Sequence, residues 1–221
     1  MAMRRTVPAL VPGTRVPMSY EEFLAFADED VHAEWVNGEV IVFMSPSSRH
    51  QVLTIWLARV VAFFTDLFDL GEVYAAPLEM RAIPGGSARE PDLLFVAREH
   101  RDRMEAQRLN GPADLIVEII SPESVRRDQV EKLREYVAAG VREYWLFDSR
   151  PLPVPPAWYR LNEAGVFAPI APDAAGRLHS TVLLGFWLDP AWLTQEPLPK
   201  PLAMMQQIAP DALRAALDGA Q

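Results

Sequence analysis

Residues 114–120 read DLIVEII, a nearly continuous apolar run that is interrupted by one acid, Glu118. A run of this kind is typical of a central strand that is covered on both faces of a sheet. The segment 143–148, EYWLFD, predicts a second strand. A capping box at Asp128 and a favoured terminating residue at Gly140 predict a helix between the two strands. The order strand, helix, strand predicts a right-handed crossover between parallel strands, and therefore an α/β fold.

The N-terminal part carries signals for a helix, a hairpin and a longer helix. A capping box that begins at Ser19 predicts a short helix over residues 20–27. Asn-Gly at residues 37–38, between apolar runs, predicts a β-hairpin over residues 34–43 because both residues tolerate positive φ. Apolar residues then recur at helical spacing, which predicts a long core helix over residues 49–67.

Shorter apolar runs predict more strands on both sides of the central pair. The last three of these strands are expected to extend the sheet as an antiparallel edge. A charged segment, residues 98–108, is predicted to be helical. The predicted additional strands are residues 73–83, which Pro77 interrupts, and residues 91–96, 158–161, 166–170 and 181–188.

The composition restricts the classes of function. A chain of 221 residues is long enough for one domain with a full core. The formal net charge of −9 argues against a protein that coats nucleic acid, but not against an enzyme whose acids hold metal. The absence of cysteine excludes disulfides, thiolate zinc sites and cysteine nucleophiles. Neither a membrane-spanning run nor a signal-peptide core is present, so we expect a cytoplasmic protein.

Two acids at the ends of predicted strands are the first candidate site residues. Glu118 lies within an apolar strand, where a carboxylate needs a cation, a proton or a metal ion. An ion pair with an arginine, or a strand end that reaches solvent, is the alternative. Asp92 follows Pro91 at the start of another strand, where ordinary turn chemistry would also explain it. Together the two carboxylates would suit one hard cation such as Mg²⁺.

A lysine is the third candidate. Only two of the 21 basic residues are lysines, Lys132 and Lys200. Asp128, Lys132 and Tyr136 fall on one line of the predicted helix, from which Lys132 can point back toward the end of the preceding strand. An ammonium group there would stabilise charge on a phosphate or orient an attacking water. The alternative is a surface ion pair between Lys132 and Asp128.

These residues also resemble a known family. Pro91-Asp92 followed by Glu118-Ile119-Ile120 resembles the PD-(D/E)xK nuclease pattern. More closely, residues 18–193 resemble the Uma-type restriction endonucleases. The segments that carry this resemblance are YEEF at 20–23, EWVNGE at 34–39, SP at 45–46, His50, PD at 91–92, EIISPES at 118–124, Asp128, Lys132, Tyr136, GV at 140–141 and EYW at 143–145.

The resemblance implies a restriction-endonuclease-like core, which is a mixed sheet flanked by helices. An N-terminal hairpin and extra antiparallel C-terminal strands would be added to it. On this view residues 18–193 form a single nuclease-like domain. A flexible arm, residues 1–17, would precede the domain, and a proline-containing tail, residues 194–221, would follow it with a weak helix at about residues 211–217.

The resemblance also implies a metal site for Mg²⁺ or Mn²⁺. Asp92 and Glu118 would be ligands, with the backbone carbonyl of Ile119 as a third. The usual lysine position, two residues after the glutamate, is occupied by Ile120. The resemblance suggests that Lys132 replaces that lysine from the following helix.

Two further residues match family positions. Glu39 would add a carboxylate to the site. His50 would contact metal-bound water or phosphate, and a purely structural histidine is the alternative reading.

The expected function is metal-dependent endonucleolytic hydrolysis of phosphodiester bonds in DNA, by a homodimer that does not bind membranes. Arg126 and Arg127 are candidate phosphate contacts, unless they belong to a solvated surface of mixed charge. One alternative is a non-catalytic scaffold that self-associates through the tail around Met204 and Met205. The other is a phosphohydrolase that acts on small phosphoesters. The further candidate phosphate contacts are Arg98, Arg101, Arg103 and Arg108.

Overall fold

A mixed β-sheet forms the centre of the molecule. The structure is a computed structural model that describes residues 14–26, 33–151 and 153–219. Within these residues six strands pair in the order β11-β10-β9-β8-β6-β4. Only β8 and β9 are parallel, and the other neighbours are antiparallel. The strands are β4 (Gly71–Ala75), β6 (Leu93–Ala97), β8 (Leu115–Ile120), β9 (Glu143–Asp148), β10 (Ala157–Leu161) and β11 (Phe167–Pro169).

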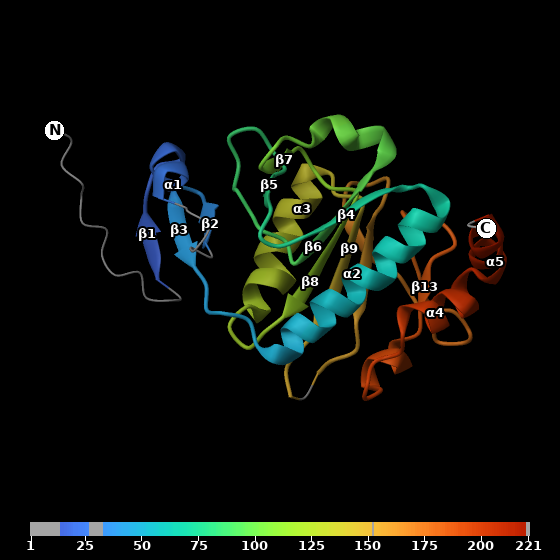
Figure 1. The fold of residues 1–221 in the computed structure, drawn as a ribbon. Coiled ribbons are helices and arrows are strands. Elements are labelled where there is room, and N and C mark those ends of the chain that lie inside the picture. The colour runs from blue at the N-terminus through green and yellow to red at the C-terminus, as the bar shows by residue number, and fades with distance from the viewer. Residues whose placement is uncertain (1–13, 27–32, 152, 220–221) are drawn as a thin grey trace.

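The central strands and their crossover agree with the sequence. Every residue of β8 and β9 is buried. The chain between them forms a π-helical segment (Arg127–Lys132) that continues into α3 (Leu133–Ala139). Gly140 ends α3 with φ of 80°. The predicted α/β fold with a mixed sheet flanked by helices is confirmed (Figure 1).

Helices cover the two faces of the sheet (Figure 1). The long helix α2 (Ser48–Phe68) packs Leu57 and Val60 against Val117 and other residues of one face. On the other face, Tyr136 of α3 packs in a second cluster that contains Ile116 of β8. By length and composition α2 is apolar enough to span a membrane, but its buried apolar residues belong to this core.

A small sheet near the N-terminus pairs three strands in the order β1-β3-β2. The predicted capping box is confirmed, because Ser19 and Glu22 each accept a hydrogen bond from the other's backbone N–H. The predicted Asn-Gly turn is confirmed by positive φ at both residues. Residues 15–17, expected in a flexible arm, instead pair with β3, whereas residues 1–13 lie outside the described residues. The elements are β1 (Arg15–Pro17), α1 (Tyr20–Phe26), β2 (Ala33–Val36) and β3 (Glu39–Val42).

Three predicted elements differ from the structure. The strand predicted over residues 73–83 splits at Pro77 into β4 and β5 (Glu79–Arg81). The helix predicted over residues 98–108 is a 3₁₀ helix (Arg98–Arg103) followed by β7 (Arg108–Asn110), which pairs with β5. The strand predicted over residues 181–188 is wrong, since only β13 (Trp187–Leu188) forms, opposite β12 (Leu178–His179). The turn between β12 and β13 contains Gly185 with φ of 91°.

The C-terminal segment packs Met204, Met205 and Leu213 into the core. A 3₁₀ helix (Pro190–Thr194) leads to α4 (Pro201–Ile208) and α5 (Pro210–Gly219), and α5 contains the weak helix expected from the sequence. Met204 and Met205 are fully buried in the cluster that α2 forms with the sheet. The interpretation of these methionines as a self-association surface is therefore wrong.

Candidate active site

The two predicted acids meet at one end of the central sheet. Leu93 of β6 pairs with Val117 of β8, so Asp92 lies one step beyond that pair, opposite Glu118. Oδ2 of Asp92 accepts a 2.7 Å hydrogen bond from the backbone N–H of Ile119. Because directly opposite residues of an antiparallel pair share a face, this register brings the two carboxylates to the same cleft.

Lys132 turns back from the crossover helix toward Glu118, as the sequence predicts. Its Nζ lies 2.7 Å from Oε1 of Glu118, and the hydroxyl of Tyr136 donates to the same oxygen at 2.9 Å. The alternative i,i+4 contact to Asp128 also exists, but at 3.7 Å. Glu118 therefore has the cation that its burial requires, and that cation is a lysine, not an arginine.

The helix begins earlier than predicted, and this changes the position of Asp128. Ser124 closes the turn after β8 by accepting the Ser121 N–H on its hydroxyl, and the Asp128 N–H donates to the Ser124 carbonyl. Asp128 is thus an interior residue of the helix and not its cap, which corrects the prediction. In the π-helical turn both Asp128 and Lys132 are buried. Single π-turns are frequent at functional sites.

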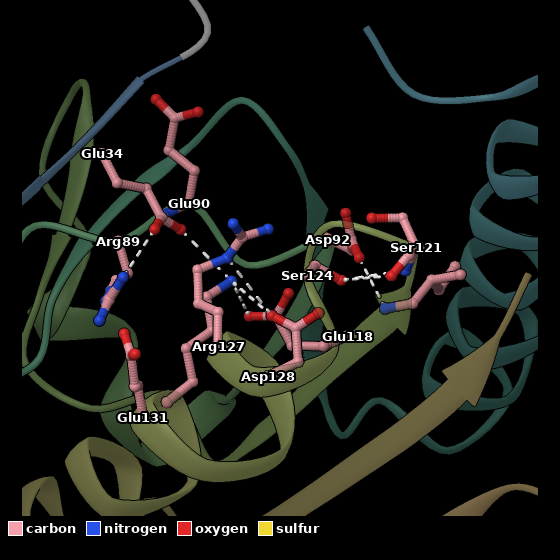
Figure 2. Close-up of polar contacts among 12 residues, drawn as sticks. Glu34, Arg89, Glu90, Asp92, Glu118, Ser121, Ser124, Arg127, Asp128 and Glu131 are labelled. Atoms are coloured by element: carbon pink, nitrogen blue, oxygen red, sulfur yellow. Dashed lines mark hydrogen bonds and ion pairs between the residues drawn. The ribbon is translucent and has the colours of Figure 1, made fainter. Parts of the chain in front are cut away.

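Glu34 of β2 is a buried member of the site that the sequence reasoning did not select. Its Oε1 lies 3.3 Å from Lys132 Nζ and accepts the Glu90 N–H at 3.2 Å. Its Oε2 accepts a 2.8 Å hydrogen bond from Arg89, which Glu135 of α3 holds with two further hydrogen bonds. Figure 2 shows Glu34, Arg89 and Asp128 in this cluster. The EWVNGE motif contained Glu34, but nothing in the sequence indicated its partners.

The electrostatics of the cluster are set by burial and by its few cations. Burial raises the pKa of Glu118 to about 8, and the charge of Lys132 only partly opposes this. Burial also raises the pKa of Asp128. At Glu34 burial acts in the same direction, but Lys132 and Arg89 overcome it and lower the pKa to about 2. Burial would lower the pKa of Lys132, yet Glu118 and Glu34 raise it, so the amine stays protonated.

His50 lies at the start of α2 on the other side of Asp92. Ser47 caps the helix by accepting the His50 N–H on its hydroxyl. Nε2 of His50 lies 3.3 Å from Oδ2 of Asp92. Burial would lower the His50 pKa, but the hydrogen bond and charge of Asp92 and a hydrogen bond to the Ile119 backbone raise it.

A cleft of about 240 Å³ joins most of the predicted site residues. Tyr136 lies behind Glu118 in the core. Arg127 lines the cleft with its guanidinium 4.4 Å from the centre of the Phe43 ring. The predicted residues that line the cleft are His50, Asp92, Glu118, Ile119, Arg127, Asp128 and Lys132, and Glu34 joins them.

Several other predicted residues lie away from the cleft. Glu39 pairs with Arg15 at the surface, so it adds no carboxylate to the site. Arg126 is exposed and pairs with Glu131. Four more arginines, expected as phosphate contacts, also lie elsewhere and contact Asp69, Glu72, the Pro112 carbonyl and Glu79. These are Arg98, Arg101, Arg103 and Arg108.

The donor atoms suit a hard divalent cation. Asp92, Glu118 and Asp128 offer carboxylate oxygens, which Mg²⁺ prefers. Oδ1 of Asp128 is buried and has no hydrogen-bond partner. Among the residues that the structure describes, no three acidic or histidine side chains already surround a common point for an ion. Lys132 and Tyr136 both donate to Oε1 of Glu118, so a cation that bound this oxygen would have to displace Lys132.

Comparisons with known proteins identify the fold and the family of this chain. A solved structure, described as "a putative nuclease belonging to DUF820 from Anabaena variabilis ATCC 29413", is similar to this chain with a TM-score of 0.63 and 17% sequence identity. The match covers 80% of this chain and 97% of that chain, and it shows the shared fold. A search of curated proteins finds no match. The model of the Uma2 family, described as "Putative restriction endonuclease", matches residues 20–191. The chain belongs to the Uma2 family.

Proposed function

We propose that this protein is a metal-dependent endonuclease of the PD-(D/E)xK type that hydrolyses phosphodiester bonds in DNA. The observation that carries the proposal is the 2.7 Å contact between Lys132 and the buried Glu118, beside Asp92 in an open cleft. A lysine and two acids in this arrangement are the groups that metal-assisted hydrolysis needs. Membership of the Uma2 family supports the same reaction class.

Asp92, Glu118 and the carbonyl of Ile119 would hold Mg²⁺ or Mn²⁺. The bound ion would polarise a phosphoryl oxygen and lower the pKa of a water molecule. Lys132 would stabilise the negative charge that builds on the phosphate in the transition state. His50, through its contact with Asp92, would orient that carboxylate.

The charge of the cleft favours a metal-dependent reaction over a metal-free scaffold. Six carboxylate side chains line the cleft, against the basic side chains Arg127 and Lys132. A DNA phosphate would be repelled by this excess of acid unless a cation neutralised part of it. Arg127, which stacks on Phe43 at the cleft, would contact the phosphate. The six acids are Glu34, Glu90, Asp92, Glu118, Glu123 and Asp128.

The assembly and location are part of the same proposal. A cytoplasmic homodimer would present two clefts to the two strands of a duplex. β4 is the outermost strand at one edge of the described sheet and offers an edge for pairing between two copies.

Replacing Lys132 tests the proposed reaction. We expect Lys132→Met to reduce Mn²⁺-dependent cleavage of duplex DNA by at least about 10²-fold, because a preorganised charge at the phosphate is lost. Lys200→Met is the matched control, since Lys200 is the other lysine and is exposed. Circular dichroism would establish that the variant is folded.

The outcomes separate the proposed function from its alternatives. Cleavage that persists in a folded Lys132→Met variant would remove Lys132 from the mechanism. Hydrolysis of small phosphodiesters but not of DNA would assign the site to another class of substrate. A wild-type protein that binds Mn²⁺ and cleaves neither substrate would favour the scaffold.

A further inference from the structure

We propose that Glu34 is a positioning residue, which holds the Lys132 ammonium group in the cleft when a divalent cation takes the Glu118 carboxylate. The inference rests on the metal binding in the proposed function. It assigns a role in that site to a strand of the small N-terminal sheet.

The starting point is that Lys132 has three carboxylate neighbours within the ion-pair range. Nζ lies 2.7 Å from Glu118, 3.3 Å from Glu34 and 3.7 Å from Asp128. The side chain is 3% exposed, so water compensates poorly for a lost partner. A buried ammonium that loses its counter-ion is strongly destabilised. A cation can therefore displace Lys132 from Oε1 of Glu118 only if another carboxylate compensates the Lys132 charge.

Glu34 is the better anchored of the two remaining carboxylates. Arg89 binds its Oε2, and the Glu90 N–H binds its Oε1 on the side that faces Lys132. Arg89 is fixed in turn by two hydrogen bonds to Glu135 of α3, at 2.9 and 2.5 Å. The Glu34 side chain is 2% exposed. Its carboxylate is thus held in place whether or not Glu118 keeps its contact with Lys132.

Asp128 is less suited to this role. Its distance to Lys132 is the longest of the three, and its buried Oδ1 has no hydrogen-bond partner. An oxygen with that vacancy is available to a cation. On this reasoning Glu34 retains the lysine, while the cleft-facing acids receive the metal.

The consequence is that the active site spans two sheets. Glu34 lies on β2, whereas Glu118 lies on β8 and Lys132 on the crossover helix. Figure 2 shows Glu34 and Arg89 on one side of the cluster and Asp92 on the other. The hairpin is then a functional part of the nuclease fold and not only an appended one.

The lysine content of the chain makes a direct test practical. Protein labelled with isotopes only at lysine has two side-chain signals, from Lys132 and Lys200. Lys200 is exposed and serves as the internal reference. In a Mg²⁺ titration followed by NMR, we expect the Lys132 signal to shift as Glu118 is taken, while the Lys200 signal stays in place. Loss of one signal in Lys132→Met gives the assignment.

The decisive variant is Glu34→Gln, which keeps the shape but removes the charge. We expect its Mg²⁺ affinity to fall at least about tenfold, because Lys132 then stays on Glu118 and competes with the ion. Glu39→Gln is the matched control, since Glu39 belongs to the same hairpin but pairs with Arg15 at the surface. Its Mg²⁺ affinity should equal that of the wild type. Glu34→Asp, which retains the charge, should recover part of the loss.

A partial variant covers the case in which Glu34→Gln does not fold. Glu135 is partly exposed, and Glu135→Gln loosens Arg89, and through it Glu34, without removing the Glu34 charge. A smaller loss of Mg²⁺ affinity is expected in this variant. Equal Mg²⁺ affinity in wild type, Glu34→Gln and Glu135→Gln would overturn the proposal, as would a Lys132 signal that does not respond to Mg²⁺.

Cleavage assays on the same proteins separate this inference from the proposed function. Loss of Mg²⁺ affinity in Glu34→Gln without DNA cleavage by the wild type would support the positioning role and reject the nuclease. DNA cleavage by the wild type with unchanged Mg²⁺ affinity in Glu34→Gln would support the nuclease and reject the positioning role.

Discussion

Two buried glutamates on neighbouring parallel strands have opposite kinds of surroundings. Glu118 lies in β8 and Glu143 in β9, and both are almost completely buried. Glu143 accepts hydrogen bonds from the Trp145 indole, from the Thr181 backbone and hydroxyl, and from the Val182 backbone. All of these donors are neutral, and they use both carboxylate oxygens.

Glu118 instead depends on a charge that it shares. Its two hydrogen bonds, from Lys132 and Tyr136, both reach Oε1. Lys132 is shared among Glu118, Glu34 and Asp128, and Asp92 adds further negative charge nearby. Glu143, by contrast, lies beside an aromatic core. In this core the ring centroids of Trp145 and Trp158 are 3.8 Å apart in a stacked arrangement.

The hydrogen-bond partners of a buried acid distinguish a structural role from a functional one. When neutral donors in fixed positions occupy both oxygens of a carboxylate, no oxygen is left to bind a ligand. Such a carboxylate stabilises the fold. A carboxylate that relies on a shared lysine can exchange that partner for a cation. Such incomplete satisfaction is characteristic of functional sites, where local rules of stability are broken.

The largest expected effect on stability comes from a substitution in the aromatic core beside Glu143. Trp158→Ala should lower the free energy of unfolding by about 3–5 kcal/mol, because a buried ring and its stacking on Trp145 are lost. Urea denaturation followed by circular dichroism measures this. Mg²⁺ affinity of the folded fraction should not change, since no cleft residue is altered. A large drop in Mg²⁺ affinity would mean that the two regions are coupled.

The sequence predicts the strands that carry Glu118 and Glu143 better than it predicts the partners of these two acids. The apolar runs of β8 and β9 and the Asn-Gly hairpin are local signals, and the structure confirms them. Helix geometry allowed Lys132 to point toward Glu118, 14 positions earlier in one strand–helix unit, but it also allowed the pair with Asp128, and the family resemblance favoured Glu118.

The contacts that sequence reasoning missed join distant segments. Arg89 binds Glu34 across 55 positions, and Glu143 binds Thr181 across 38. Sequence periodicity does not indicate such pairs, because neither partner departs from the pattern of its own segment. The error at Asp128 has a local cause. Its pattern fits a helix cap, but Ser124 closes a turn that starts the helix earlier.

A smaller effect is expected from replacing the saturated acid. Glu143→Gln should destabilise the protein by about 2–3 kcal/mol, because the amide NH₂ group faces donors and leaves buried N–H groups unpaired. Mg²⁺ affinity and any cleavage activity of the folded protein should remain at the wild-type level. A variant as stable as the wild type would contradict the structural role assigned to Glu143.

The smallest effect on stability should come from the same substitution at the other acid. In Glu118→Gln the amide oxygen still accepts from Lys132 and Tyr136, and the NH₂ group relieves the repulsion from Asp128 and Asp92. Lys132 keeps Glu34 and Asp128 as counter-ions, so we expect the free energy of unfolding to change by less than about 1 kcal/mol.

For Mg²⁺ binding the order of the two variants should be reversed, with the larger effect at Glu118. Calorimetry should find the Mg²⁺ affinity of Glu118→Gln at least about tenfold weaker than that of the wild type, because a charged ligand is lost. The two glutamine variants therefore form one experiment, in which Glu143→Gln loses stability and Glu118→Gln loses Mg²⁺ affinity. Equal losses of stability at both positions would show that Glu118 supports the fold as Glu143 does, and the distinction between a saturated and an exchangeable acid would not hold in this sheet.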